Sequence, residues 1–321
     1  MSHATQSSSK ATEGRFDLGM AGGKVPRPFL RWAGGKRRLT NLLIEAFPPS
    51  FDPSTSRFFE PFIGGGALMF ATGNKSAELF IPGKNIFIND SNPDLVVVYR
   101  VIKNQLPELL KELDKLSRNL SKEEFERIRS SSPKTNVTRA ARFIYLNKTC
   151  FNGLWRVNST GQFNVPWGKL KNPLIFDPLN LDACRKRLIG SKITVGGFAE
   201  AVKSATKNDL VYFDPPYLPL SPSSSFSQYA KDNFGVTDHE ELAETIARLT
   251  KKGVNVILSN SDTPETRRIF GKTLTLRQIM MNRSISAAAH ARTSVNEVLG
   301  TNYAVAKGTE ISELKVISRS R

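Results

Sequence analysis

A strand, a glycine turn, a helix and a second strand follow one another early in the sequence, and this order limits the fold more than any other feature. Three glycines at 64–66 separate the first strand pattern from the helical residues 67–72. Two more apolar strand patterns come after residue 209, with a helix at 238–252 between them. The expected strands are 57–60, 85–90, 210–213 and 254–258. Strands that alternate with helices predict an α/β fold built on a doubly wound sheet.

A basic stretch rich in helix and loop patterns interrupts this alternation. Helical spacing dominates residues 93–131 and returns at 138–149, after which residues 150–178 are dense in Asn, Gly, Pro and aromatics. Between Lys134 and Lys192 the chain has 11 basic residues and two acidic ones, so this stretch has +9 of the formal net charge of +17. Such a focused charge favours a polyanionic partner, although a solvated basic surface is the simpler alternative.

These patterns divide the chain into five segments. We expect a disordered extension at 1–27 and a short tail at 306–321. The sheet domain would be formed by 28–104 and 196–305, with a mostly helical insertion at 105–195. No apolar run approaches the roughly 20 residues that cross a bilayer, so a cytoplasmic protein without a membrane segment is expected. Cysteine and histidine are few and scattered, and for this reason we expect no metal site.

The glycine turn and the acidic residue of the next strand form the first candidate site. Gly64 and Gly66 lie where a strand meets a helix N-terminus, and glycines there let a ligand approach the backbone. Asp90 ends the following apolar strand, where a carboxylate can accept hydrogen bonds from a ribose. The pair indicates adenosine binding. An ordinary strand-to-helix turn and a helix-capping aspartate are the alternatives.

The tetrapeptide Asp214-Pro215-Pro216-Tyr217 is the most specific signal in the sequence. It directly follows the apolar strand 210–213, at the sheet edge where open α/β sheets bind their ligands. The Asp214 carboxylate and the Pro215 carbonyl can accept hydrogen bonds from the two N–H groups of an exocyclic amine and free its lone pair for attack on a methyl sulfonium. Two prolines hold that carbonyl rigidly, and Tyr217 can stack on a base. A Pro-Pro turn that only ends the strand is the alternative.

Four motifs, in this order, resemble those of the DNA adenine methyltransferase (Dam) family. They are Phe-Leu-Arg-Trp-Ala-Gly-Gly-Lys at 29–36, Glu-Pro-Phe-Ile-Gly-Gly-Gly at 60–66, Asn-Asp-Ser-Asn at 89–92 and Asp-Pro-Pro-Tyr at 214–217. The resemblance runs from about residue 28 to residue 304. It also covers the segments 145–147, 151–156, 161–166 and 282–286.

The resemblance implies an enzyme that uses S-adenosylmethionine to methylate the N6 amino group of adenine in double-stranded DNA. It implies GATC as the site, flipping of the target base, a Rossmann-like methyltransferase sheet, and a target-recognition role for residues 105–195. The positions that match contacts to the methyl donor are Trp32, Lys36, Phe62, Gly64, Gly66, Asp90 and Asp214. The positions that match the catalytic motif are Asp214, Pro215, Pro216 and Tyr217.

Six positions match the DNA contacts of the family. Arg31 corresponds to a residue that reads the outer guanine, and Asn152 to a phosphate contact. Phe151 corresponds to an aromatic that wedges into the duplex. The positions that match readers of the remaining bases are Leu154, Arg156 and Pro166. An arginine fork suits guanine, and an apolar side chain can touch a thymine methyl group.

Two of these positions depart from the family pattern, and simpler interpretations exist for several. Arg31 replaces a common lysine and Phe151 replaces a tyrosine, and both departures bear on recognition of the outer base. Phe151, Trp155 and Phe163 are alternatively core aromatics of a small helical subdomain. Arg31 and Arg156 are alternatively solvated arginines.

Two other functions stay open on the sequence alone. Related tetrapeptides serve amino methyltransferases that act on RNA bases or on cytosine N4, and a non-catalytic DNA-binding subunit can retain the fold. Motif order and the basic insertion favour a DNA adenine enzyme. One recognition segment per chain is compatible with a monomer.

Overall fold

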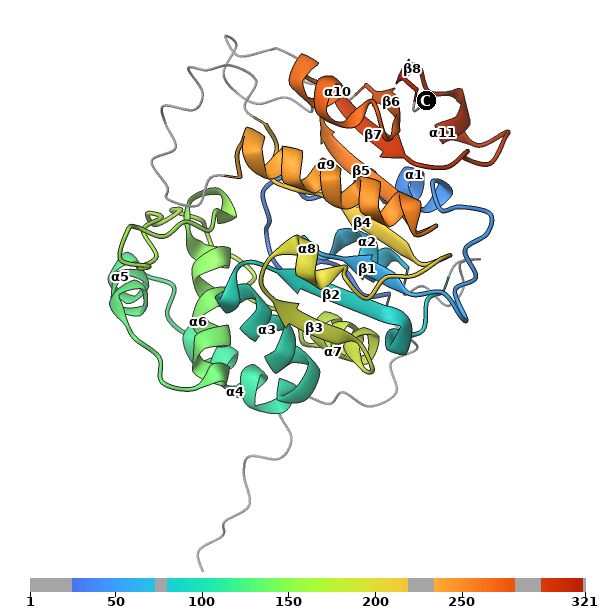
Figure 1. Cartoon of the computed structure of the whole chain (residues 1–321). Coiled ribbons are helices and arrows are strands. Elements are labelled where there is room, and N and C mark those ends of the chain that lie inside the picture. Colours follow the sequence, from blue (N-terminus) through green and yellow to red (C-terminus); the bar gives the residue numbers. More distant parts are fainter. Residues whose placement is uncertain (1–24, 73–79, 219–233, 281–295, 320–321) are drawn as a thin grey trace, which may run out of the picture.

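The structure is a computed structural model that describes residues 25–72, 80–218, 234–280 and 296–319 (Figure 1). Its centre is an 8-stranded sheet in the order β3-β2-β1-β4-β5-β7-β6-β8. Strands β1 to β5 pair in parallel, whereas β7 runs antiparallel to both β5 and β6, and β8 antiparallel to β6. The strands are β1 (Phe58–Glu60), β2 (Ile86–Asp90), β3 (Lys192–Val195), β4 (Leu210–Phe213), β5 (Asn255–Ser261), β6 (Thr275–Ile279), β7 (Glu297–Thr301) and β8 (Val316–Ser318).

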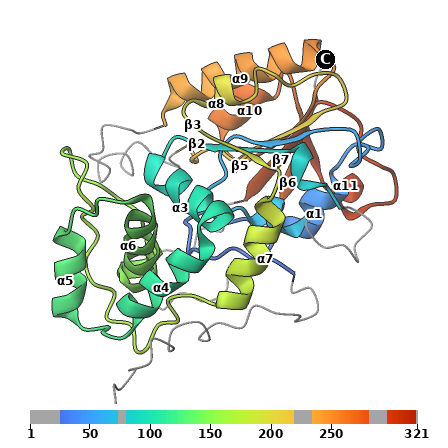
Figure 2. The ribbon, with the colours of Figure 1, turned by 90° about the horizontal axis from the view of Figure 1, so that it is seen from below.

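Helices cover both faces of this sheet, as Figure 2 shows from below. One face packs against α1 (Thr40–Glu45), α2 (Ala67–Ala71), α3 (Pro93–Asn104), α7 (Pro178–Leu188) and α11 (Glu310–Glu313). The other packs against α8 (Phe198–Ala201), α9 (Val236–Lys251) and α10 (Pro264–Phe270). Successive strand residues alternate between the two faces, so Phe58 and Phe59 are buried in different hydrophobic clusters. The expected doubly wound α/β arrangement is confirmed.

Three further helices lie to one side of the sheet, away from β6 to β8 (Figures 1 and 2). They are α4 (Leu106–Ser117), α5 (Lys122–Ser130) and α6 (Asn136–Thr149). Four leucines on one side of α4 are buried, namely Leu106, Leu109, Leu110 and Leu113, and α4 is in contact with α6. After α6, residues 150–177 contain one 3₁₀ turn, η2 (Phe151–Gly153), and two isolated β-bridges. A second 3₁₀ turn, η1 (Gly83–Asn85), precedes β2.

Two expected segment boundaries are wrong. Strand β3 (192–195) pairs with β2, and α7 packs on α3, so residues 178–195 belong to the sheet and its helical layer rather than to the insertion expected at 105–195. Likewise β8, within the expected tail at 306–321, is a strand of the sheet. Both strands are at edges and only partly buried, which removes the apolar run that marks a central strand. Of the extension expected at 1–27, residues 1–24 lie outside the described residues, as does the motif at 282–286.

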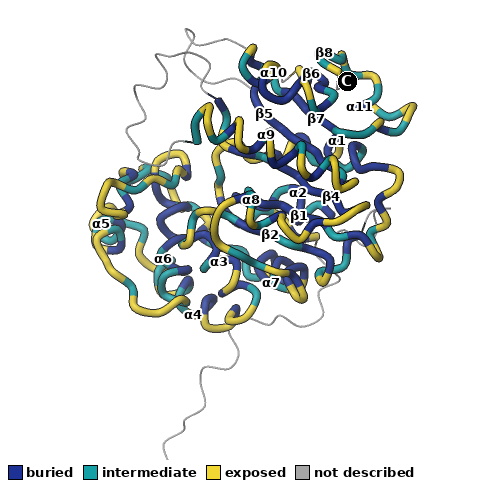
Figure 3. Tube along the Cα trace, in the orientation of Figure 1, coloured by how far each residue is buried: buried dark blue, intermediate teal, exposed yellow. Residues whose placement is uncertain are grey.

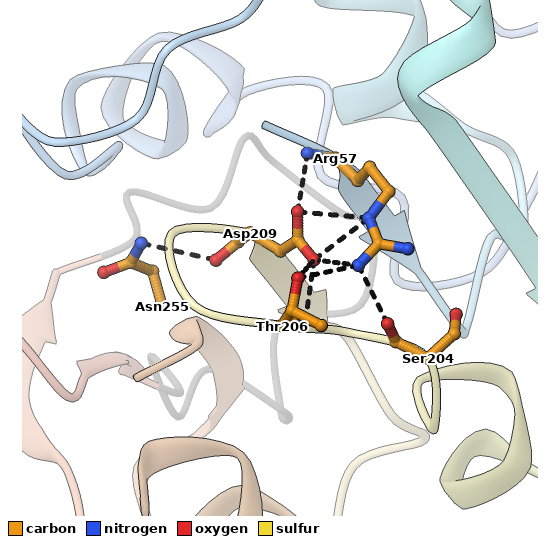
Figure 4. Close-up of polar contacts among 5 residues, drawn as sticks. All are labelled: Arg57, Ser204, Thr206, Asp209 and Asn255. Carbon is orange, nitrogen blue, oxygen red and sulfur yellow. Dashed lines mark hydrogen bonds and ion pairs between the residues drawn. The ribbon is translucent and has the colours of Figure 1, made fainter. Parts of the chain in front are cut away.

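The central strands β1 and β4 are tied together at their amino ends by an ion pair between a half-buried arginine and a buried aspartate (Figure 4). Arg57 donates from Nη2 to Asp209 Oδ2 at 2.6 Å and from its backbone N–H to Asp209 Oδ1 at 2.8 Å. The same guanidinium donates to the Ser204 carbonyl and the Thr206 hydroxyl. Asn255 Nδ2 donates to the Asp209 carbonyl, which links β5 to the network. These bonds fix the register of the strands whose opposite ends form the candidate site.

The sheet reverses its strand order between β1 and β4, because β2 and β3 follow on one side and β5 on the other. The carboxyl ends of β1, β2 and β4 therefore meet at a crevice, which is where open α/β sheets bind ligands. Figure 3 shows β1 and β4 buried along their length and β2 buried except at two half-buried positions, whereas the exposed residues gather on the outer helices and loops.

Candidate active site

Asp214 follows β4 directly, so its side chain lies at the carboxyl edge of the sheet. Its Oδ1 lies 2.9 Å from Lys36 Nζ and accepts a hydrogen bond of 2.7 Å from Ser259 Oγ on β5. Burial raises the pKa of Asp214 above its usual range, and the Lys36 ammonium and the Ser259 hydroxyl oppose that rise. Lys36 is itself buried, and it also donates to the Gly34 carbonyl at 2.7 Å. A half-buried carboxylate is therefore paired with a buried cation.

Tyr217 joins the same network through both its ring and its hydroxyl. Its hydroxyl donates to Glu297 Oε2 on β7 at 2.9 Å, and Lys36 Nζ lies 4.4 Å from its ring centroid. Burial and the carboxylates of Asp214 and Glu297 raise the pKa of Tyr217, so its hydroxyl stays protonated as the donor. Lys36 and Glu297 also line a cavity of ≈ 630 Å³. This volume is within the range of small-molecule sites.

The glycine turn after β1 lies against Trp32 and Asp90. Gly64 has φ +45°, and a Cβ there would lie 2.7 Å from Trp32 Cδ1, so only glycine fits beneath the indole. The Gly64 N–H donates to Asp90 Oδ2 at 3.1 Å, and the Asn92 N–H donates to Asp90 Oδ1 at 3.0 Å. The buried Tyr99 Oη donates to the Gly64 carbonyl at 2.9 Å and fixes the turn.

Asp90 is not the cap of the following helix. Asn92 fills that role, since its Oδ1 accepts hydrogen bonds from the N–H groups of Asp94 and Leu95. The helix-capping alternative for Asp90 is therefore wrong. Burial raises the pKa of Asp90, and three backbone N–H groups oppose the rise.

Phe62 lies on the other side of the glycine turn from Trp32. Trp32 packs against the hydrophobic cluster that includes α3 and α6, whereas Phe62 packs against the cluster beneath α8 and α9. The Phe62 ring stacks on Phe198 with centroids 5.5 Å apart and meets Phe234 edge-on at 5.5 Å. Gly66, at φ +69°, starts α2, and a Cβ there would lie 2.8 Å from Tyr99 Oη. The rings of Trp32 and Phe62 thus flank the glycine turn, and the Asp90 carboxylate at the end of β2 accepts a hydrogen bond from it.

The six residues that match DNA contacts are all exposed and lie in two segments. Arg31 precedes Trp32, and the other five are in the loop region after α6. Phe151 is 50% exposed and Leu154 is 38% exposed, which is unusual for large apolar side chains. The exposed residues of this group are Arg31, Phe151, Asn152, Leu154, Arg156 and Pro166.

The loop after α6 folds back on itself as a hairpin, here called the 150–167 hairpin. Bridges join Cys150 to Trp167 and Val157 to Phe163, and the Phe151 N–H donates to the Pro166 carbonyl at 2.9 Å. Phe163 is buried and packs at a tilt of 45° against Trp155, whose ring stacks on Phe143 of α6 with centroids 3.6 Å apart. The core interpretation is therefore confirmed for Trp155 and Phe163 and wrong for Phe151.

Arg31 and Arg156 have defined partners in the protein. Arg156 Nε donates to Asn164 Oδ1 at 2.7 Å, within the hairpin. The backbone of Arg31 is bound by Asn147 of α6, and its side chain packs on Gly153. Lys148 lies near Arg31, and burial together with the positive charge of Arg31 lowers the pKa of Lys148 to about 8. Sequence reasoning missed Lys148, Ser259 and Glu297, because no motif marks them and only the fold brings them to the site.

The described residues contain no group of three His, Cys, Asp or Glu side chains that could hold a metal ion. Within the same part of the chain, no helix combines the length and apolar character needed to cross a membrane.

Comparison with known proteins decides the family. The family model described as D12 class N6 adenine-specific DNA methyltransferase matches residues 32–284, which is more than half of the chain. The chain belongs to the D12 class of N6 adenine-specific DNA methyltransferases. It is therefore an enzyme of the DNA adenine-N6 methyltransferase type, and its substrate class is DNA.

Relatives of this D12 methyltransferase match almost from end to end. The chain is 38% identical over 285 residues to the Type II methyltransferase M1.LlaDCHI of Lactococcus lactis subsp. cremoris, covering 86% of this chain and 95% of the relative. It is 37% identical over 294 residues to the Type II methyltransferase M.MjaIII of Methanocaldococcus jannaschii, with 86% and 99% covered. It is 31% identical over 281 residues to a DNA adenine methylase of Vibrio cholerae, with 86% and 96% covered.

Proposed function

We propose that this D12 methyltransferase transfers a methyl group from S-adenosylmethionine to the N6 amino group of adenine in duplex DNA, within the sequence GATC, after flipping the base. One observation supports this most directly. Lys36 is far in sequence from Asp214 and Tyr217, yet the three side chains form one network at the carboxyl edge of the sheet, with Lys36 buried and the other two half-buried. That edge is where the fold binds its ligands.

The geometry around Asp214 suits an exocyclic amine. Both protein contacts to the carboxylate use Oδ1, so we assign Oδ2 and the Pro215 carbonyl as the acceptors of the two amine N–H groups. Accepting both protons draws the nitrogen toward a tetrahedral form with a free lone pair, and preorganised acceptors achieve this without reorganisation. Tyr217 would stack on the adenine, with its ring held in place by Glu297.

The residues beside the glycine turn fit S-adenosylmethionine. The oxygens of Asp90 that bind Gly64 and Asn92 keep lone pairs for a ribose diol. Gly64 leaves no room for a Cβ beneath Trp32, and Phe62 and Trp32 offer aromatic surface on either side. When bound, the cofactor supplies an electrophilic methyl group on a sulfonium. The protein residues would orient both reactants, and Lys36, near Asp214, would balance the carboxylate charge.

The exposed residues of the 150–167 hairpin and Arg31 would read the DNA. We assign α4 to α6 and residues 150–177 to target recognition and the layers around the sheet to catalysis. Because the Asp214 side chain is only 20% exposed, a base stacked in a duplex cannot reach it, and flipping is required. Phe151, half-exposed at the start of the hairpin, is suited to fill the gap that the flipped base leaves.

Transfer of labelled methyl from S-adenosylmethionine to two duplexes tests this function. One duplex contains a single GATC and the other contains the same bases in scrambled order, and the product base is identified afterwards. We expect N6-methyladenine in the GATC duplex alone. Asp214→Ala should abolish transfer while DNA affinity is retained, which excludes a pure DNA-binding role. Equal label in both duplexes would contradict GATC, and label on RNA or on cytosine would contradict the substrate.

A further inference from the structure

Asn147, near the end of α6, is a buried amide that joins two segments far apart in the sequence. Its Oδ1 accepts a hydrogen bond of 2.9 Å from the Arg31 N–H. Its Nδ2 donates to the Arg31 carbonyl at 2.7 Å and to the Gly153 carbonyl at 2.9 Å. The side chain has no exposed surface. Because the amide binds both the N–H and the C=O of Arg31, it fixes the backbone of that residue relative to Gly153.

Arg31 and Gly153 also pack directly against each other. A Cβ added at Gly153 would lie 2.4 Å from Arg31 Cβ and 2.9 Å from Arg31 Cδ. Gly153 has φ +65°, a conformation that L side chains rarely adopt. The turn 151–154, which presents Phe151, Asn152 and Leu154, is thus seated on Arg31 with no space between them.

The segment that Asn147 holds continues into the active site. Trp32, the next residue, lies against Gly64, and Lys36 pairs with Asp214. Trp32 also stacks on Phe143 of α6, with ring centroids 6.4 Å apart and planes at 16°. Residues 31–36 therefore contact the turn 151–154, the glycine turn and Asp214 in succession. A shift of the turn 151–154 must be taken up by this segment, since close-packed interiors transmit displacement.

We propose that Asn147 is a positioning residue that couples the reading of DNA by the turn 151–154 to the placement of Arg31 and Lys36. This inference rests on the proposed function, in which Arg31 and the turn contact DNA. A duplex that fits leaves Arg31 and the turn in the arrangement that Asn147 links. A duplex with a wrong base displaces the turn, and the displacement passes through residues 31–36 to Lys36 and Asp214. Asn147 thereby increases discrimination without contact with a base.

Two variants break this link in different ways. Asn147→Asp keeps the acceptor for the Arg31 N–H but loses both amide donors and faces two carbonyl oxygens with a carboxylate. Gly153→Ala leaves Asn147 intact and forces the turn away from Arg31. Gly308→Ala is the matched control, because Gly308 has φ +76° and no atom within 4 Å of an added Cβ. It introduces similar backbone strain outside the proposed site.

In the test, the wild-type enzyme and each variant methylate a pool of duplexes of randomised sequence with S-adenosylmethionine, and N6-methyladenine is located by sequencing. The measured quantity is the ratio of initial rates at the preferred sequence and at sequences with one changed base. We expect Asn147→Asp and Gly153→Ala each to lower this ratio at least tenfold, and Gly308→Ala to retain the wild-type ratio.

Two results would overturn the inference, and they are distinguishable. If both variants slow methylation at every sequence by the same factor, Asn147 only supports the fold and the proposed function is unaffected. If the wild-type enzyme itself methylates without sequence preference, the proposed function fails and the inference fails with it. Should Asn147→Asp not fold, Gly153→Ala decides the question, because it breaks the same contact and retains the buried amide.

Discussion

Ser259 Oγ lies 2.7 Å from Asp214 Oδ1 and 3.0 Å from the Tyr212 hydroxyl, so the Asp214 carboxylate ends a hydrogen-bond chain that begins in the core. The single proton of Ser259 is given to the carboxylate, and Tyr212 must therefore donate to the Ser259 oxygen. The hydrogen bonds therefore run in one direction, from Tyr212 through Ser259 to Asp214. The Ser259 hydroxyl stabilises the ionised form of Asp214, because a hydroxyl donor favours a charged acceptor.

Ser259→Ala should raise the pKa of Asp214 and reduce turnover. A hydrogen bond to a charged group contributes about 1.5–3 kcal/mol, which corresponds to a shift of roughly one to two pH units. In its proposed role Asp214 accepts hydrogen bonds from the amine only when ionised, so the fall of kcat at low pH should begin at a higher pH in this variant. Single-turnover rates from pH 5 to pH 9 measure this. Ser261→Ala, which removes a buried hydroxyl from the same strand, should leave the pH of this fall unchanged. An unchanged pH of this fall in Ser259→Ala would exclude the assigned role.

The hydrogen bond between Tyr217 and Glu297 should orient the stacking ring. Glu297→Ala and Tyr217→Phe each remove this bond of 2.9 Å, and each should lower kcat/KM about fivefold, the equivalent of about 1 kcal/mol. Because both changes remove the same interaction, the double variant should lose little more than either single variant. Glu297→Gln keeps an acceptor oxygen and should lower kcat/KM the least of these variants. Fully additive losses in the double variant would show that the two residues act separately.

DNA affinity should fall as pH rises through about 8. Lys148 has its pKa lowered to about 8 by burial and by Arg31, so it is charged below that pH and loses its charge above it. Losing one cation near DNA reduces the slope of log affinity against log salt by about 0.9. Titrations of a duplex at pH 7 and pH 9 over a range of salt should show this difference. Lys148→Arg should show the wild-type pH 7 slope at both pH values, because arginine stays charged. Lys148→Met should show the wild-type pH 9 slope at both pH values, because methionine has no charge. A decline in Lys148→Arg equal to that of the wild type would assign the effect to another group.

Breaking the ion pair between Arg57 and Asp209 at the amino ends of β1 and β4 should destabilise the protein without changing its chemistry. Asp209→Asn leaves the half-buried Arg57 guanidinium without its anion, and losing hydrogen bonds to a charged group costs about 1.5–3 kcal/mol of unfolding free energy. Urea denaturation measures this cost. The kcat of the folded protein should be retained, since the pair lies at the sheet edge opposite the candidate site. Glu240→Gln removes an exposed partner of Arg268 and should cost about 0.5 kcal/mol or less. Similar urea midpoints of unfolding for Asp209→Asn and Glu240→Gln would contradict the structural role of Asp209.

The central strands and the helices α2, α3 and α9 were predictable because their residue patterns are local. The run Leu210–Phe213 is apolar at every position, and α9 begins and ends within two residues of the helix expected at 238–252. Strand β3 escaped because its side chains are half-exposed at a sheet edge, so the burial that shapes a sequence pattern is weak there.

The candidate site was predictable only in its motifs. Asp90, Asp214 and Gly64 stand out because strand ends and glycine turns have sequence signatures. The contacts of Lys36 with Asp214 and Tyr217 depend on how a segment before the first strand crosses the sheet, and no local pattern encodes that path. Asn147 and Ser259 are ordinary residues within a helix and a strand, and their roles come from the partners that the fold gives them.

The position of Trp32 between Gly64 and Phe143 limits how such an enzyme can acquire a new target sequence. The 150–167 hairpin is continuous in the sequence, but Arg31, on which its Gly153 turn packs, belongs to the segment 29–36. A chimera that imports the hairpin of a relative alone would pair a foreign Gly153 turn with the resident Arg31. In the proposed function, exchange of specificity between relatives therefore requires two separate stretches of the gene to change together, and the proposed reading module is discontinuous in the chain.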